Sequence, residues 1–189
     1  MQHCDTKADN WVIASSDLVG GENIDGSNVV LTDFGRAIDL QEVSRANPLE
    51  SKLKGKASRD DMMCVAMRQG LPWSFDIDTY GLCDTAHVLL FGCNLEIERS
   101  TTTGRFAPKQ RFRRYHQREL WSTLFDTLLN LEQPSKTAIG SRPRSLRQIR
   151  VKFEAHLAEK ETELKAQLKH QAAFLPLKRP GVSPRNRKA

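Results

Sequence analysis

Four polar side chains near the start of the chain have types and spacing that suit phosphoryl transfer. Asp5, Lys7 and Asn10 follow the pattern D-x-K-x-x-N, and Asp33 opens the tripeptide Asp-Phe-Gly. Phosphoryl transfer needs a carboxylate that aligns an acceptor hydroxyl, a cation near the moving phosphoryl group and oxygen ligands for Mg²⁺. Asp5 can orient and deprotonate the hydroxyl, and Lys7 can neutralise the phosphate. Asn10 and Asp33 can supply the oxygens that hold Mg²⁺.

Short β-rich runs on either side of a polar loop are expected to bring the two metal ligands together. Residues 11–14 read WVIA and residues 29–32 read VVLT, and both runs favour strands. The residues between them are dense in Gly, Ser, Asp and Asn, which predicts a loop joining a hairpin. The hairpin would place Asn10 beside Asp33. Each motif alone is weak evidence because it is short, but their order and the hairpin make a joint signal.

The middle of the chain is expected to contain a long loop followed by two helices. Residues 41–61 lack clear periodicity and carry many charges, which is typical of a loop. From Pro72 to Phe91 apolar residues lie on most sides, which indicates a helix buried inside the domain. Residues 118–130 carry apolar pairs spaced four apart, and this pattern predicts an amphipathic helix that ends before Pro134.

One long helix is expected from Ser145 to about Ala173. Apolar residues mark one face, and Glu and Lys fill the other. The apolar stripe is interrupted at Lys160 and Glu161, which favours packing against the rest of the domain over a coiled coil. The residues that follow are rich in proline and basic side chains and are expected to be disordered.

The two motifs at the start of the chain resemble the catalytic loop and the metal-binding motif of protein kinases. Lys7 stands where serine/threonine kinases carry a lysine, which argues against a tyrosine kinase. Asp78 and Gly81 match the buried central helix of the kinase C-terminal lobe, where the aspartate caps the catalytic-loop backbone. The resemblance implies four supporting residues for the site, which are His3, Phe34, Gly35 and Asp78.

Three longer stretches are similar to Bub-type mitotic checkpoint serine/threonine kinases. They read DFGRAIDL (33–40), PWSFDIDTYGLCDTAHVLLFG (72–92) and RFRRYHQRELWSTLFDTLLN (111–130). That family has a small residue before the catalytic aspartate, an Ile-Asp pair after the metal motif and an Arg-Tyr then Leu-Trp signature ahead of its late helices. The similarity runs from Gln2 to about Ala173.

The resemblance implies a mainly α fold with a short β-hairpin, that of a kinase C-terminal lobe with the N-terminal lobe absent. Residues 1–140 would form this lobe, with the catalytic loop, the metal motif, the activation segment and the central and late helices. Residues 141–173 would form the amphipathic helix that packs on it, and residues 174–189 would form a basic tail.

The sequence departs from the kinase pattern at three places. Most kinases read His-Arg-Asp where this chain has Cys4, and Cys4 cannot pair with a phosphorylated activation loop. Ala66 replaces the glutamate that closes the family's activation segment and normally forms a buried ion pair with an arginine. The interval between the two metal ligands is longer than most kinases need, so we expect a loop insertion around Gly20 to Asn28.

The nucleotide-binding motifs of kinases precede the catalytic loop, and this sequence contains no G-x-G-x-x-G. Only Met1 and Gln2 precede His3, so no N-lobe residue for nucleotide binding is present. We therefore expect that the chain alone does not bind ATP usefully. The helix that would cover the central helix is also absent, so one side of residues 77–91 should face water and leave the chain marginally folded.

The function implied by the resemblance is transfer of the γ-phosphoryl group of ATP, with Mg²⁺, to serine or threonine of kinetochore and chromatin proteins. The full protein would serve the spindle assembly checkpoint, contact other checkpoint proteins, and lie in the nucleus, at the kinetochore in mitosis, or otherwise in the cytoplasm. An alternative is a non-catalytic, pseudokinase-like scaffold that docks checkpoint partners. Retention of the four reactive side chains argues against that alternative, and Ala66 argues mildly for it.

The net charge of +6 is concentrated in two stretches of the sequence. Residues 178–188 hold five basic groups and residues 99–118 hold seven, with no acidic group in either, so the remainder carries 6 − 5 − 7 = −6. The second stretch includes Phe106, Phe112 and Tyr115, which makes nucleic-acid binding a third hypothesis. A solvated or substrate-facing surface is the favoured interpretation, and nucleic acid is not the expected partner.

Four separate cysteines, with no CxxC pair and no secretory leader, indicate free thiols in a reducing compartment. Cys83, His87 and Cys93 could suggest zinc, but no second pair of ligands accompanies them, so buried structural residues are favoured. No run of 18 apolar residues occurs, and a membrane partner is not expected.

Overall fold

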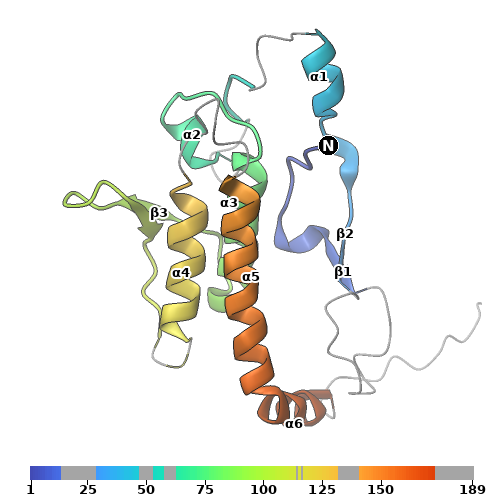
Figure 1. Ribbon diagram of the computed structural model, residues 1–189, viewed down its shortest axis with the longest axis vertical. Helices are drawn as coiled ribbons and strands as arrows, with labels where there is room; N and C mark the ends of the chain where they lie inside the picture. The colour runs from blue at the N-terminus through green and yellow to red at the C-terminus, as the bar shows by residue number, and fades with distance from the viewer. Residues whose placement is uncertain are drawn as a thin grey trace, which may run out of the picture.

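The computed structural model describes residues 1–13, 29–46, 53–57, 63–113, 115, 117–131 and 141–172 (Figure 1). The helices in these ranges are α1 (Leu40–Ala46), α2 (Val65–Arg68), α3 (Asp76–Phe91), α4 (Arg118–Leu129), α5 (Ser141–Glu159) and α6 (Glu161–Ala172). The strands are β1 (Trp11–Ile13), β2 (Val29–Leu31), β3 (Ile97–Arg99) and β4 (Phe106–Pro108). Two single-turn 3-10 helices, Ala8–Asn10 and Phe34–Arg36, flank the first hairpin. No helix in these ranges is both long enough and apolar enough to cross a bilayer.

The hairpin expected near the start of the chain is confirmed. Strands β1 and β2 pair antiparallel, with Trp11 opposite Leu31. The pairing continues one step beyond the strands, because the amide of Thr32 donates to the carbonyl of Asn10 at 2.8 Å. The register therefore places Asn10 next to the residue that precedes Asp33.

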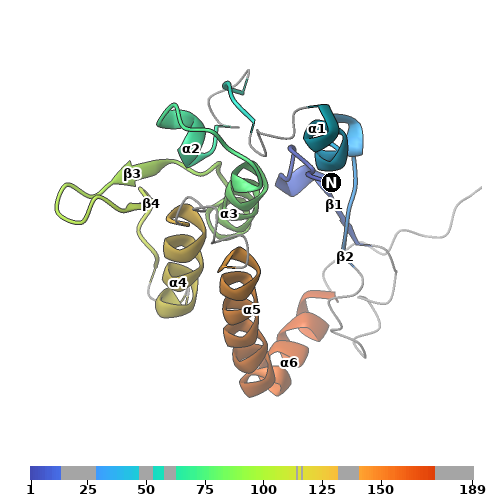
Figure 2. The ribbon, with the colours of Figure 1, turned by 45° about the horizontal axis from the view of Figure 1, so that its top comes forward.

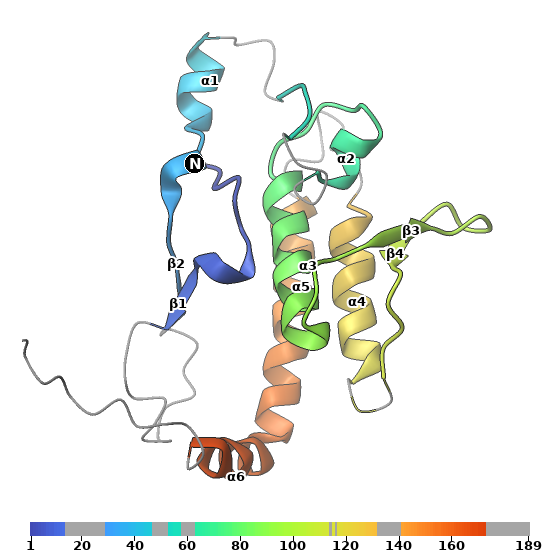
Figure 3. The same cartoon turned by 180° about the vertical axis from the view of Figure 1, so that it is seen from behind.

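Helix α3 lies in the middle of the helical body and packs against α4 (Figures 2 and 3). Gly92 ends the helix in the left-handed conformation (φ 73°) and returns its amide to the carbonyl of Val88 at 2.8 Å. The predicted buried helix is confirmed, since seven residues of α3 are buried. The exception is Leu89, which is 77% exposed. Water therefore reaches only part of one side of α3.

An aromatic cluster ties α3 to α4. The ring of His87 lies 4.6 Å from Phe91, and Phe112 lies 5.7 Å from both Phe91 and Phe125. His87 and Phe125 are almost fully buried. This cluster explains why the apolar pairs of residues 118–130 predicted α4 correctly, because their spacing turns one face toward α3.

The expectation of a loop over residues 41–61 is wrong at its start, where α1 forms. Asp39 caps this helix by accepting the amide of Gln41 at 2.8 Å, and Glu42 pairs with Arg45 one turn later. Asp39 and Glu42 have the spacing of a capping box, which is the sequence signal that was missed. Leu53 forms a β-bridge with Trp73, and the chain bends at Gly55. The remaining part of that loop, the insertion at Gly20 to Asn28 and the tail at 174–189 lie outside the described residues.

A second hairpin, β3–β4, was not predicted and occupies part of the basic stretch 99–118 (Figure 1). The cations of this hairpin form hydrogen bonds or ion pairs with other groups of the chain. Arg105 forms a bidentate pair with Asp126 on α4, and Lys109 pairs with Glu96 at 2.9 Å. Arg99 donates to the carbonyl of Gly104 at 2.9 Å. The two ion pairs neutralise part of the positive charge that a nucleic-acid-binding surface would present.

The expected single helix from Ser145 to Ala173 is wrong, because α5 and α6 meet at a bend at Lys160 (Figure 1). Helix α5 packs on α4, where the rings of Trp121 and Phe153 are 4.9 Å apart, edge to face. A helix of 12 residues spans about 18 Å and one of 19 residues about 28 Å, so α5 outruns α4. Beyond that point α6 has no α4 surface to follow, and the interruption of the apolar stripe coincides with the bend.

Two leucines test the division between the core and the open side of α3. Leu128 on α4 is 6% exposed, whereas Leu89 on α3 is 77% exposed. We expect Leu128→Ala to lower the free energy of unfolding by about 2 to 5 kcal/mol, because it leaves a cavity. The matched change Leu89→Ala should alter it by about 0.5 kcal/mol or less. Urea denaturation followed by circular dichroism measures both, and equal losses would contradict this division.

Candidate active site

The loop that carries Asp5 is held by the carboxylate of Asp78, which projects from the first turn of α3. One carboxylate oxygen accepts the amide of His3 at 2.9 Å, and the other accepts the amide of Cys4 at 2.7 Å. The hydroxyl of Thr6 donates to the same carboxylate at 3.3 Å. Cys4 has a positive φ of 63°, an unfavourable conformation for a residue other than glycine, and these bonds hold it there. This is the contact that the sequence resemblance implied for Asp78.

Asp5 is buried and held from two sides by the other residues of its motif. The ammonium of Lys7 lies 3.3 Å from one carboxylate oxygen of Asp5. The amide nitrogen of Asn10 donates to the backbone carbonyl of Asp5 at 2.7 Å and reaches its carboxylate at 3.3 Å. The structure thus brings together the three residues of the D-x-K-x-x-N motif, with the carboxylate fixed between a cation and an amide.

His3 connects this loop to the strand that precedes Asp33. Its Nδ1 accepts the amide of Asp5 at 3.3 Å, and its Nε2 lies 2.9 Å from the carbonyl of Thr32. Since Nδ1 is an acceptor, the neutral ring carries its proton on Nε2 and donates it to Thr32. The ring of Phe34 stands edge-on to His3, with centroids 4.8 Å apart. The imidazole therefore links the two motifs by hydrogen bonds.

Asp33 lies at the end of the hairpin in the left-handed conformation, with φ 62°. Its carboxylate is exposed, and one oxygen accepts the amide of Gly35 at 3.4 Å. No bond joins Asp33 directly to Asn10 among the described residues. The two are linked through Thr32, whose amide and hydroxyl both donate to the Asn10 carbonyl at 2.8 and 3.1 Å. Both oxygen ligands of the predicted metal site thus sit at one end of the hairpin.

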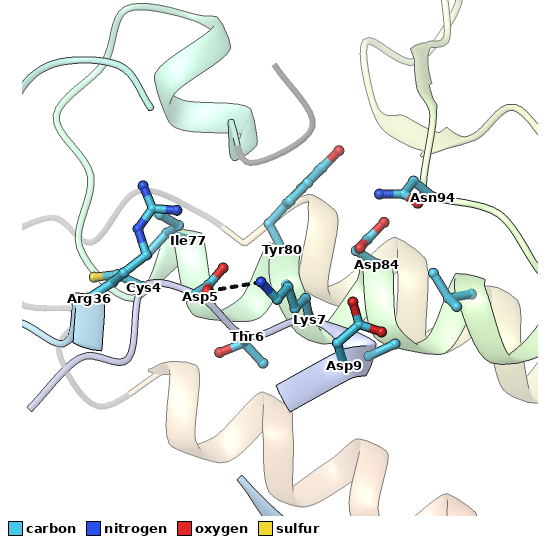
Figure 4. Close-up of a pocket in the computed structure, with 13 residues that line it drawn as sticks. Cys4, Asp5, Thr6, Lys7, Asp9, Arg36, Ile77, Tyr80, Asp84 and Asn94 are labelled. Atoms are coloured by element: carbon cyan, nitrogen blue, oxygen red, sulfur yellow. Dashed lines mark ion pairs between the residues drawn. The ribbon is translucent and has the colours of Figure 1, made fainter. Parts of the chain in front are cut away.

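A cavity of about 340 Å³ opens beside Asp5 and Lys7 (Figure 4). The loop that carries Asp5 forms one wall of the cavity, while Tyr80 and Asp84 of α3, together with Asn94, form another. The carboxylate and the ammonium meet at this cavity, so a hydroxyl that entered it would reach both groups.

Gly81 allows the loop to lie directly on α3. A Cβ atom at position 81 would overlap the carbonyl oxygen of Thr6 and lie 2.8 Å from the Thr6 Cβ. The glycine is needed here for close approach, because its helical φ is accessible to any residue. Asp78 and Gly81, one turn apart, therefore fix the loop by hydrogen bonds and by contact.

Two threonines that the sequence analysis did not single out belong to this framework. Thr6 bonds to Asp78, and Thr32 bonds to both His3 and Asn10. Their signal in the sequence is weak, because each is one ordinary residue next to a motif. Gln2, which the sequence analysis also did not single out, is fully buried, and its side-chain amide donates to the carbonyl of Ser74.

The residues that replace family side chains are buried without charge. Burial, reinforced by the nearby charge of Asp78, raises the pKa of the Cys4 thiol to about 11. Ala66 is buried in α2 and lines a cavity of about 190 Å³ between α2, α3 and β4. Arg68, two residues on, donates to the carbonyl of Met63 at 2.9 Å and to the hydroxyl of Tyr80 at 3.3 Å.

The three residues with zinc-like spacing have other contacts. Cys83 is fully buried in α3, and Nδ1 of His87 lies 2.8 Å from the backbone carbonyl of Cys93. The Cys93 thiol is exposed and accepts from the amide of Gln110 at 3.8 Å. Their roles in the described structure are to pack α3 and to hold the turn that follows it.

The loop with its buried aspartate, the hairpin that ends in Asp-Phe-Gly and the central helix that anchors both define the fold of a protein kinase C-terminal lobe. No family model matches the sequence. A crystal structure of the BubR1 kinase domain is similar, with a TM-score of 0.72 and 30% sequence identity, over 92% of this chain and 48% of that one.

Similarity to curated proteins indicates which kind of protein kinase this lobe resembles. The spindle assembly checkpoint serine/threonine-protein kinase BUB1 of Saccharomyces cerevisiae is 35% identical over 138 residues, which are 73% of this chain and 13% of the relative. The spindle assembly checkpoint serine/threonine-protein kinase bub1 of Schizosaccharomyces pombe is 33% identical over 175 residues, 85% of this chain and 16% of the relative. The chain corresponds to a portion of a Bub-type kinase domain. It spans less than a fifth of these two relatives.

Replacing Gly81 tests the close approach of the loop to α3. In an ordinary helix Gly→Ala gains up to about 1 kcal/mol. Here we expect Gly81→Ala to lower the free energy of unfolding by more than about 2 kcal/mol, because backbone atoms must move to admit the methyl group. Thr85→Ala, one turn later, is the control, since the Thr85 hydroxyl is buried without a partner in the described structure. Chemical denaturation of both variants decides, and a stabilised Gly81→Ala chain would contradict the prediction.

The four cysteines should differ sharply in reactivity. All are free thiols, and only Cys93 is exposed. We expect one fast-reacting thiol per native chain with DTNB at pH 8, and four after denaturation. Because burial raises the folded-state pKa of the Cys4 thiol above its ordinary value, to about 11, this thiol should stay protonated at pH 10 while the chain remains folded. A second fast thiol that disappears in a Cys4→Ser variant would overturn this assignment.

Proposed function

We propose that this chain supplies the catalytic-loop half of a serine/threonine protein kinase active site that serves the mitotic checkpoint. The observation that carries the proposal is the buried Asp5 carboxylate, held between Lys7 and Asn10 at the edge of a cavity. Asp5 accepts the proton of the substrate hydroxyl as that oxygen attacks the γ-phosphoryl group, and Lys7 stabilises the charge on the phosphoryl oxygens. The scaffold alternative requires none of these contacts.

The oxygen donors at the hairpin fit Mg²⁺. The Asn10 amide nitrogen is committed to Asp5, which leaves its amide oxygen as the atom for a cation. The Asp33 carboxylate is exposed at the same end of the hairpin. A carboxylate and an amide oxygen are the hard ligands that Mg²⁺ prefers, so Asn10 and Asp33 would hold it. When bound, Mg²⁺ neutralises charge on the ATP phosphates, with ATP as the phosphoryl donor.

The names of the matched relatives are the basis for the substrates and the location proposed for this chain. The matched relatives bear names as spindle assembly checkpoint serine/threonine kinases. We therefore propose kinetochore and chromatin proteins as phosphate acceptors, other checkpoint proteins as partners, and the nucleus as the place of action, with the kinetochore occupied in mitosis. The similar kinase domain is about twice the length that the chain covers, so nucleotide binding would require the other half of such a domain.

The roles of these residues can be tested by joining the chain to the nucleotide-binding lobe of a Bub-type kinase. We expect the joined protein to transfer ³²P from ATP to serine or threonine of a histone substrate. Asp5→Asn should lower kcat by about 100-fold or more, because the base is lost while the side-chain shape is kept. Asp33→Asn should raise the Mg²⁺ concentration that gives half-maximal rate, because a carboxylate ligand is lost.

Asp126→Asn is the matched control for these substitutions. Asp126 lies on α4, is about half exposed and pairs with Arg105, so its replacement should leave kcat within about twofold. Full activity of the Asp5→Asn protein would refute the role given to Asp5 and would favour the scaffold alternative.

A further inference from the structure

The first half of α5 carries a concentration of positive charge. Residues 141–153 contain five basic side chains and no acidic one. The first turn of α5 also lacks an acidic residue, so nothing on it offsets the partial positive charge of the helix N-terminus. In the basic stretch 99–118, by comparison, Arg105 and Lys109 form ion pairs with Asp126 and Glu96.

Three of these cations line a groove beside the α4–α5 contact. The groove has a volume of about 650 Å³ and includes Arg144, Arg147 and Lys152. Helices α4 and α5 lie side by side there (Figures 1 and 2). Within the described parts of the chain, none of the three cations forms an ion pair. By contrast, Arg150 on another face of α5 pairs with Glu154 at 2.6 Å.

The groove also exposes apolar surface between its cations. Val151 lines it and is 62% exposed, while Ile149 lines its floor and is buried. Thr123 and Thr127 form the wall on α4. No acidic and no aromatic side chain is among the lining residues. Apolar surface next to unpaired cations is typical of a surface that meets a partner with both apolar and acidic side chains.

We propose that this groove binds an acidic, amphipathic peptide segment of a partner protein. A helical rise of 1.5 Å per residue puts Arg147 about 4.5 Å from Arg144 along the α5 axis and about 7.5 Å from Lys152. Carboxylates three and five residues apart on a partner helix have the same axial spacing. An apolar residue between them would cover Val151. A helix laid into a groove by its apolar face is a common mode of peptide recognition.

Nucleic acid matches the groove less well. Phosphate groups would pair with the cations but would leave Val151 uncovered, and the lining offers no aromatic ring on which a base could stack. The occupant that satisfies both the charge and the apolar surface is the peptide. This binding does not depend on phosphoryl transfer, so it can hold whether or not the proposed kinase function does.

Fluorescence anisotropy with the full 189-residue chain tests the proposal. The probe is a fluorescein-labelled helical peptide of Glu-Leu-Glu-Glu repeats, and a Gln-Leu-Gln-Gln peptide of the same length measures the part due to charge. We expect the acidic peptide to bind at least about tenfold more tightly than the neutral one. Arg147→Glu should weaken that binding by about tenfold or more, and Arg147→Gln by a smaller factor.

The matched control is Arg150→Glu, the same charge reversal on the same helix but outside the groove. It should change affinity by less than about twofold, with circular dichroism confirming equal helix content in all variants. Equal weakening by Arg147→Glu and Arg150→Glu would overturn the proposal in favour of general charge attraction. Tighter binding of a 24-base-pair DNA duplex, lost in Arg147→Glu, would overturn it in favour of nucleic acid. Failure of the acidic peptide to bind would overturn it outright.

Discussion

The structure of the site depends on the carboxylate of Asp78. A loop that must place a reactive aspartate cannot fold as a helix or strand, so its amides need partners from elsewhere. Asp78 accepts two of them, from His3 and Cys4, and also the hydroxyl of Thr6. Because Asp78 projects from a helix packed against α4, the position of the loop is set by the domain core.

A second set of hydrogen bonds connects the loop to the hairpin. His3 joins the amide of Asp5 to the carbonyl of Thr32, and Thr32 in turn bonds to Asn10. The proposed base Asp5 and the proposed metal ligand Asn10 thus share one hydrogen-bonded network, in which the side chains of Asp78 and His3 connect separate segments.

Much of this arrangement could be predicted from the sequence, because local patterns encode it. The spacing of Asp5, Lys7 and Asn10, the β-rich runs and the helix of 118–130 each follow a rule of a few residues. The bend at Lys160 could not be predicted, since it depends on where α4 ends. The β3–β4 hairpin was not predicted, because its charged residues were interpreted as a surface and the turn residues between the strands were not considered. The roles of Thr6 and Thr32 required the distances themselves, because bonds between distant segments leave no periodicity.

Asn10 and Thr32 are joined at the open end of a short ladder, and the chain between the strands leaves from the opposite end. Their separation is fixed by pairing, so it does not depend on how many residues the connection contains. Doubling the length of a flexible connection costs only about 0.6 kcal/mol in closure entropy. Evolution, or an engineer inserting a reporter, is therefore free to vary that connection while the geometry at its base stays constant.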